Sequence, residues 1–284
     1  MGLRSWLTDR LVHFLTQPSR HYEHRTRHDL TRLTRHIRKG DILLVEGDER
    51  VSAVIKMLTQ SCWSHAALYI GDELLRRGGG VREEAIERFG PEGARHLLVE
   101  ALFEGVVVSP IDKYADYHLR LCRPHRLRAE HLRQVVASAT ASVGWPYDVR
   151  NILDLARHLL LIGLMPTRHR RAVERMGSSR TTEVICSSLL GRIFQDVGFP
   201  VLPTVVDDEG APALPEARGS LLQRLRRPRT PYPGTFLPRH PTLLAPRDFD
   251  LSPYFEIVKF DAIADGDFDY QRIAWGDPAE DEVA

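Results

Sequence analysis

The chain has 284 residues and a mass of 32.4 kDa, which suffices for one large domain or two modest ones. Hydrophobic residues make up 43% of the chain, so it can bury a core, and a charged fraction of 27% is typical of globular proteins. The 39 Lys and Arg residues nearly balance the 38 Asp and Glu residues. The resulting net charge of +1 argues against a dedicated nucleic-acid-binding protein.

Three cysteines, Cys62, Cys122 and Cys186, are widely spaced and include no C-x-x-C pair. This pattern predicts neither a disulfide framework nor a thiolate zinc site, and it fits a reducing compartment. Cys62 and His65 alone supply too few ligands for a metal, so we expect no metal and no cofactor. No apolar run reaches the roughly 18 residues of a membrane span, and the first residues lack a secretory pattern. The sequence therefore predicts a cytoplasmic protein.

The first 38 residues form an amphipathic and basic lead that we expect to be helical. Between Leu3 and Leu15 the apolar residues recur at helical spacing, and the stretch from Arg20 to Lys39 is rich in Arg and His. One interpretation is a helix that packs on the protein's own core. The other is a peripheral contact of residues 1–18 with the inner membrane surface, with Trp6 and Phe14 in the interface.

Residues 39–262 are predicted to form one domain in which most strands lie in the first half and most helices in the second. Short apolar runs bounded by turn residues predict strands at 42–45, 65–70, 97–102, 106–109, 118–122 and 254–260. Helical periodicity marks 51–60, 129–143, 149–161 and 183–197, whereas 76–93, with three consecutive glycines, reads as a surface excursion. Segregated strands and helices predict an α+β class, with an antiparallel sheet or small barrel packed against a helical half.

Two further segments have unusual compositions. Ten of the chain's 18 prolines lie between Pro200 and Pro246, which predicts a long loop within the domain. Residues 263–284 form an acidic tail.

Three segments carry residues that could take part in a chemical reaction. His65 begins a predicted strand, Glu100 interrupts an apolar strand, and Cys186 lies in the first turn of a predicted helix with Thr181 or Thr182 as candidate caps. A thiolate is the attacking form of cysteine, and the N-terminus of a helix stabilises it. An imidazole can take the thiol proton, and a third polar group can orient that imidazole.

These segments resemble the NlpC-type cysteine peptidase superfamily, in particular its circularly permuted YiiX/YaeF-like branch. In that branch the histidine strand precedes the cysteine helix, the reverse of the order in papain. The resemblance rests on segments at 40–44, 63–71, 99–101, 105–107, 144–148 and 186–187, with 245–248 as a late match. It implies a permuted papain-like fold over roughly residues 40 to 200.

The resemblance also implies roles for four residues. Cys186 would be the nucleophile, His65 the general base and Glu100 the group that orients the imidazole. Tyr147 would point its hydroxyl toward the site and assist the oxyanion, although a turn residue packed behind Pro146 is an equally valid interpretation. The chain departs from the family at Ser188, where an acidic residue is common, and in a long stretch between Tyr147 and Cys186.

The sequence therefore predicts a thiol hydrolase or acyltransferase that acts on an amide or ester through a thioester acyl-enzyme. The substrate would be a small molecule, lipid-like or a short peptide. Two alternatives stay open: a cell-wall peptide amidase or endopeptidase, and a non-catalytic binding protein of the same fold. A complete set of Cys186, His65 and Glu100 favours catalysis over binding alone.

Overall fold

The structure is a computed structural model, and it describes residues 10, 13, 17–18, 29–146, 185–206, 235–260, 266 and 269–272. Several predictions lie outside these residues. They include nearly all of the helix at 3–15, the helix at 149–161, the caps Thr181 and Thr182, and Tyr147.

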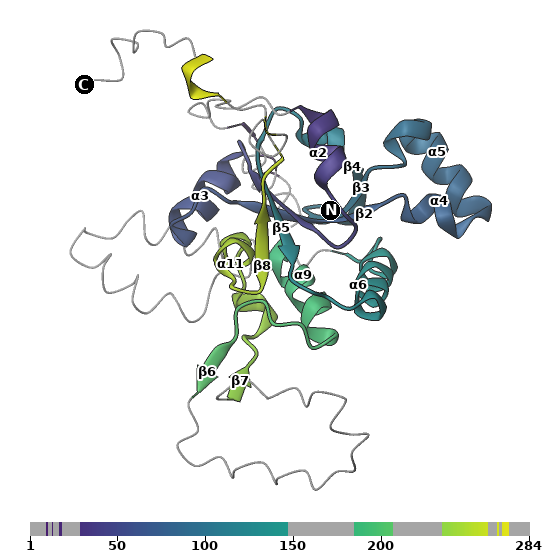
Figure 1. Ribbon diagram of the computed structural model, residues 1–284. Helices are drawn as coiled ribbons and strands as arrows, with labels where there is room; N and C mark the ends of the chain where they lie inside the picture. The colour runs from purple at the N-terminus through teal and green to yellow at the C-terminus, as the bar shows by residue number, and fades with distance from the viewer. Residues whose placement is uncertain are drawn as a thin grey trace, which may run out of the picture.

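Six strands form one antiparallel sheet in the order β4-β3-β2-β1-β5-β8 (Figure 1). They are β1 (Ile42–Glu46), β2 (His65–Gly71), β3 (Leu97–Leu102), β4 (Gly105–Pro110), β5 (His118–Pro124) and β8 (Phe255–Val258). All six predicted strands and the α+β class are confirmed. Among the described strands β4 and β8 end the sheet without pairing to each other, so of the two predicted forms the sheet is the one observed.

Helices cover one face of the sheet. They are α6 (Ala129–Ala141), α9 (Ile185–Asp196) and the short α11 (Pro246–Leu251), all in the lower half of Figure 1. Helix α9 packs across β2 and β3 and also contacts α6. The predicted helix at 129–143 and the described part of that at 183–197 are confirmed. The shared core includes the buried residues Ile42, Leu44, Ala66, Leu68, Val99, Val135, Cys186, Leu190, Phe194 and Phe249.

The opposite face of the sheet is covered by α2 (Leu30–His36), within the predicted basic lead, and by the 3₁₀ turn η1 (Ile111–Tyr114). Asp29 caps α2 by accepting a hydrogen bond from the Thr31 backbone N–H at 2.8 Å. This second core includes Leu33, Ile37, Leu43, Val45, Ala67, Leu98, Tyr114 and Leu121. Because both faces are covered, β1 is apolar at successive positions and does not alternate with polar residues.

The segment expected to be a surface excursion is largely exposed, and it is helical. Helix α4 (Glu73–Arg77) and helix α5 (Gly79–Gly93) lie beside the β2–β4 end of the sheet (Figure 1). The triple glycine interrupts the chain only between them, because Gly78 and Gly79 adopt positive φ values of 69° and 57°. The residues that follow are mostly helix-forming and exposed, so glycine content alone is a poor guide here.

The remaining helix and hairpin lie at the periphery. Helix α3 (Arg50–Thr59) confirms the helix predicted at 51–60. Within the proline-rich segment, β6 (Thr204–Val206) pairs with β7 (Thr235–Leu237), which differs from the expected loop, and the turn η2 (Pro241–Leu243) contacts α9. The acidic tail contains the turn η3 (Tyr270–Arg272). Among the described residues no helix is long and apolar enough to cross a membrane.

Candidate active site

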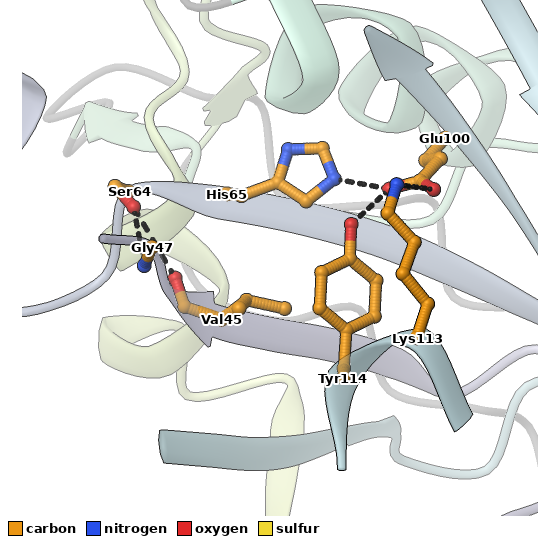
Figure 2. Close-up of polar contacts among 7 residues, drawn as sticks. All are labelled: Val45, Gly47, Ser64, His65, Glu100, Lys113 and Tyr114. Atoms are coloured by element: carbon orange, nitrogen blue, oxygen red, sulfur yellow. Dashed lines mark hydrogen bonds and ion pairs between the residues drawn. The ribbon is translucent and has the colours of Figure 1, made fainter. Parts of the chain in front are cut away.

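His65 is the first residue of β2, and its backbone is anchored by the residue before it. Ser64 is buried, accepts a hydrogen bond from the Gly47 N–H at 2.9 Å and lies 3.5 Å from the Val45 carbonyl (Figure 2). These contacts tie the entry of β2 to the end of β1. The side chain of His65 is 16% exposed, so its ring lies near the surface at the end of the strand.

Glu100 lies on β3 with its side chain fully buried. Its Oε2 is 2.6 Å from His65 Nε2 and also accepts a hydrogen bond from the Tyr114 hydroxyl, while Oε1 is 2.8 Å from Lys113 Nζ (Figure 2). A carboxylate can only accept hydrogen bonds, so Nε2 of His65 carries the proton of this contact. Three donors therefore satisfy a charge that would be costly to bury alone.

Cys186 is the second residue of α9 as the structure describes it, and it is 5% exposed. Because α9 packs on β2 and β3, the cysteine comes from the helix that covers the two strands carrying His65 and Glu100. The next residue, Ser187, is fully buried and donates a hydrogen bond to the Leu244 carbonyl. That bond ties the start of α9 to the turn before α11.

Cys186 lies close enough to the His65 ring for its charge and hydrogen bonding to act on the pKa of that ring. Burial lowers the pKa of His65, but the charge and hydrogen bonding of Cys186 and Glu100 outweigh it and raise this pKa to about 10. Glu100 occupies Nε2, which leaves Nδ1 as the second ring nitrogen. Cys186 on α9 and Glu100 on β3 thus act on the same imidazole.

The neighbours of Glu100 keep its carboxylate ionised. Burial raises the pKa of Glu100, but hydrogen bonds and charge from His65 and Lys113 outweigh burial and hold it well below its usual range. Burial, together with the charge of Glu100, raises the pKa of Tyr114 well above its ordinary value, so the hydroxyl remains a donor. Neither Lys113 nor Tyr114 was singled out in the sequence.

The other two cysteines lie in different surroundings. Burial raises the pKa of the Cys122 thiol to about 12. Burial and the nearby charge of Glu46 raise the pKa of the Cys62 thiol. Neither cysteine contributes to the interactions that raise the pKa of His65, whereas Cys186 does.

The fourth predicted site residue, Tyr147, lies outside the described residues, but the chain is described up to Pro146. There the Trp145 carbonyl accepts a hydrogen bond from the Val106 N–H at 3.1 Å, and the Gly144 N–H donates to the Val106 carbonyl at 2.8 Å. Gly105 has φ +126°, and a Cβ on it would lie 2.7 Å from the Trp145 carbonyl oxygen. Glycine at this position therefore lets the 144–146 segment approach β4.

Some residues within the segments of resemblance have structural contacts away from the site. Buried Asp41 accepts two hydrogen bonds from the Arg123 guanidinium, at 2.9 and 2.7 Å, and one from the Arg38 N–H at 2.8 Å. Buried Trp63 donates its indole N–H to Asp250 at 3.0 Å. Both contacts fasten the strands to neighbouring segments and explain these residues without any chemistry.

A metal at the site is not suggested by the donor set in the part of the chain that the structure describes. Within it no group of three or more His, Cys, Asp or Glu side chains is arranged to hold a metal ion. The donors around Glu100 are a lysine, a tyrosine and a histidine.

No protein-family model matches the chain, and no curated protein matches it significantly in sequence. Among solved structures, the chain is similar to the metalloprotein YiiX of Escherichia coli O157:H7, with a TM-score of 0.41 and 14% sequence identity. That match covers 80% of this chain and 98% of YiiX. Similarity at this level is too weak to transfer a metal, a substrate or an activity.

Proposed function

We propose that the chain is a cysteine-nucleophile hydrolase or acyltransferase that acts on an amide or an ester. The observation that carries the proposal is the 2.6 Å contact of the His65 imidazole with the buried Glu100 carboxylate, together with Cys186, which affects the same imidazole from the helix that packs on β2 and β3. A thiol, a base and a group that orients the base are the components of nucleophilic catalysis by cysteine.

In the first step, the Cys186 sulfur attacks the substrate carbonyl carbon as a thiolate, with its proton held on His65. A C–S bond forms, the C–N or C–O bond to the leaving group breaks, and His65 returns the proton to the departing amine or alcohol. Water or another acceptor then attacks the thioester, which releases the acyl group and restores the thiol. Backbone N–H groups in the first turn of α9 would stabilise the oxyanion in both steps.

Glu100 has a supporting role in this scheme. Its carboxylate accepts the Nε2 proton of His65, which orients Nδ1 toward the sulfur and stabilises the imidazolium formed when the thiol ionises. The fold would be a circularly permuted papain-like fold, because the strand that carries His65 precedes the helix that carries Cys186. The antiparallel sheet covered by α9 is compatible with that arrangement.

The proposed function has two versions, which differ in the acyl group of the substrate. A lipid-like amide or ester is favoured if the apolar stretch at 3–15 meets a membrane surface, and a short peptide amide is favoured otherwise. A binding protein of the same fold would have no need for a thiol beside an imidazole that is itself held by a buried carboxylate.

Acyl probes of increasing chain length test the proposal on the full chain. Thioester-forming esters and amides with short to long acyl chains are incubated with the protein, and the adduct is located by mass spectrometry. We expect one acyl group on Cys186, and loss of labelling in Cys186→Ala but not in Cys122→Ala. No acylation of Cys186 by any probe, with the protein folded, would remove the enzymatic proposal, and the preferred chain length separates lipid-like from peptide-like substrates.

A further inference from the structure

The turn η1 delivers two side chains to the buried carboxylate of Glu100. Lys113 Nζ lies 2.8 Å from Oε1, and the Tyr114 hydroxyl donates a hydrogen bond to Oε2, the oxygen that also contacts His65 Nε2. The two donors are adjacent in sequence and follow β4 directly, while Glu100 lies on β3, which pairs with β4. The hairpin of β3 and β4 and the turn after it thus bring acceptor and donors together.

We infer that Lys113 and Tyr114 are positioning residues, which hold the Glu100 carboxylate ionised and aimed at the Nε2 of His65. This inference rests on the proposed function, because it assigns the two residues to the same reaction. Both residues hydrogen-bond Glu100 and not the reacting thiol of Cys186, so each acts through Glu100 and His65.

The geometry requires more than one donor. The Glu100 side chain is fully buried, and His65 engages only Oε2. With His65 as the sole partner, Oε1 would remain a buried acceptor without a donor, and the carboxylate could rotate about its last bond. Lys113 occupies Oε1 and Tyr114 adds a second donor to Oε2, so the plane of the carboxylate is held from both oxygens.

The two residues contribute differently. Tyr114 is 5% exposed, and its ring lies in the core beneath β3, so its hydroxyl is a rigid donor. The Lys113 side chain is 38% exposed, and its ammonium lies over the Tyr114 ring at 5.1 Å from the centroid. Lys113 therefore places a compensating positive charge beside the Glu100 carboxylate from the surface. Tyr114 fixes the orientation of that carboxylate from the interior.

Other charges also act on this group. Cys186 on α9 lies close enough to His65 to affect its pKa, and Glu49, which precedes α3, lies close enough for the charges of His65 and Lys113 to affect its own pKa. Tyr117 packs edge-on against Tyr114 and donates to Asp48 at 3.1 Å. None of these described groups hydrogen-bonds Glu100, whereas Lys113, Tyr114 and His65 do.

The test compares variants at the site with matched variants elsewhere in the full chain. Tyr114→Phe is paired with Tyr69→Phe, which removes the hydroxyl of a tyrosine that is also 5% exposed and whose partner is His96 at 2.8 Å. Lys113→Met is paired with Lys39→Met. In the wild type the Lys39 ammonium lies 2.8 Å from Asp72 and Glu73. Lys113→Arg is the conservative replacement. All variants are checked for folding by circular dichroism.

Two measurements separate positioning from stability. One is the rate at which the acyl probe labels Cys186, which should fall by about tenfold in Tyr114→Phe and Lys113→Met and recover in Lys113→Arg. The other is the low-field proton resonance of the His65 Nε2–H in the NMR spectrum, assigned by its loss in His65→Gln. It should move in the two site variants and stay in place in Tyr69→Phe and Lys39→Met.

The two measurements can overturn the inference and the proposed function separately. A resonance and a rate that both match the wild type in the folded site variants would overturn the inference, and so would a change in only one of them. Wild-type protein that is never acylated would defeat the proposed function instead. In that case the resonance by itself decides whether Lys113 and Tyr114 position Glu100.

Discussion

His65 and Glu100 are linked by a 2.6 Å contact although 35 positions separate them in the chain. The register of β2 and β3 pairs Leu68 with Val99, and one further step along it places Glu100 across from Ala67, two residues from His65. Such diagonal neighbours on one face of a sheet are about 7–8 Å apart, within reach of a glutamate and a histidine. The sheet register therefore creates the pair.

Replacing Glu100 with Gln should destabilise the fold. The variant leaves the positive charges of His65 and Lys113 beside a buried neutral amide, which costs about 3 kcal/mol in the free energy of unfolding. Urea denaturation measures this loss. Glu256→Gln is the control, because the exposed pair with His125 should contribute less than about 1 kcal/mol. Equal losses in the two variants would contradict the interpretation of Glu100.

Stability should fall at alkaline pH because of His65. The pKa of His65 is raised from its ordinary value of 6.5 to about 10, since Cys186 and Glu100 outweigh the effect of burial. The folded state thus holds a proton that the unfolded chain releases, so the stabilisation is complete below pH 6.5 and disappears as the pH rises toward 10. Urea midpoints between pH 6 and 10 should decline in the wild type. A decline of the same size in His65→Gln would exclude His65 as its cause.

Stability should also fall in acid because of Glu100. Its pKa is held well below the ordinary 4.5, since the interactions with His65 and Lys113 outweigh burial. The stabilisation is therefore complete above pH 4.5 and is lost as the pH falls further. Acid unfolding followed by circular dichroism should occur at higher pH in Lys113→Met than in Lys39→Met. Identical acid midpoints in these two variants would argue against Lys113 as a partner of Glu100.

Cys186 should be the most reactive of the three cysteines. Iodoacetamide at pH 6 should label it first, because its thiol lies beside His65. The pKa of Cys122 is raised to about 12 by burial, and that of Cys62 is raised by burial and by Glu46. Peptide mapping by mass spectrometry gives the labelled positions, with Cys186→Ser as the control. Equal labelling of Cys62 and Cys186 would contradict the assignment.

Gly105→Ala should destabilise the protein, whereas Gly80→Ala should not. At Gly105 the φ of +126° is unfavourable for alanine, and the new Cβ would lie 2.7 Å from the Trp145 carbonyl oxygen. We expect a loss on the order of 2 kcal/mol, measured by thermal unfolding. Gly80 lies in α5, and a Cβ added there would meet no atom within 4 Å, so alanine should be neutral or slightly stabilising. A similar melting temperature for both variants would exclude a special role for Gly105.

Local sequence patterns determined much of this protein. Apolar runs ended by turn residues located the strands that carry His65 and Glu100, and helical periodicity located the helix that carries Cys186. These features are readable because the positions of buried side chains in a strand or helix repeat with the period of the backbone. The position of Glu100 within an apolar strand also indicated that its carboxylate has polar partners, because an unpaired buried charge is unfavourable.

Only the tertiary structure decided which residues those partners are. Lys113 and Tyr114 lie in a short turn after β4, where a lysine and a tyrosine have no periodicity that sets them apart from other surface residues. Their contact with Glu100 depends on the pairing of β3 with β4 and on the packing of η1 beneath the sheet. Likewise, the packing of α9 against β2 and β3 brings Cys186 near enough to His65 to affect its pKa. Contacts between distant segments follow from how whole elements pack, and no local repeat in the chain encodes that packing.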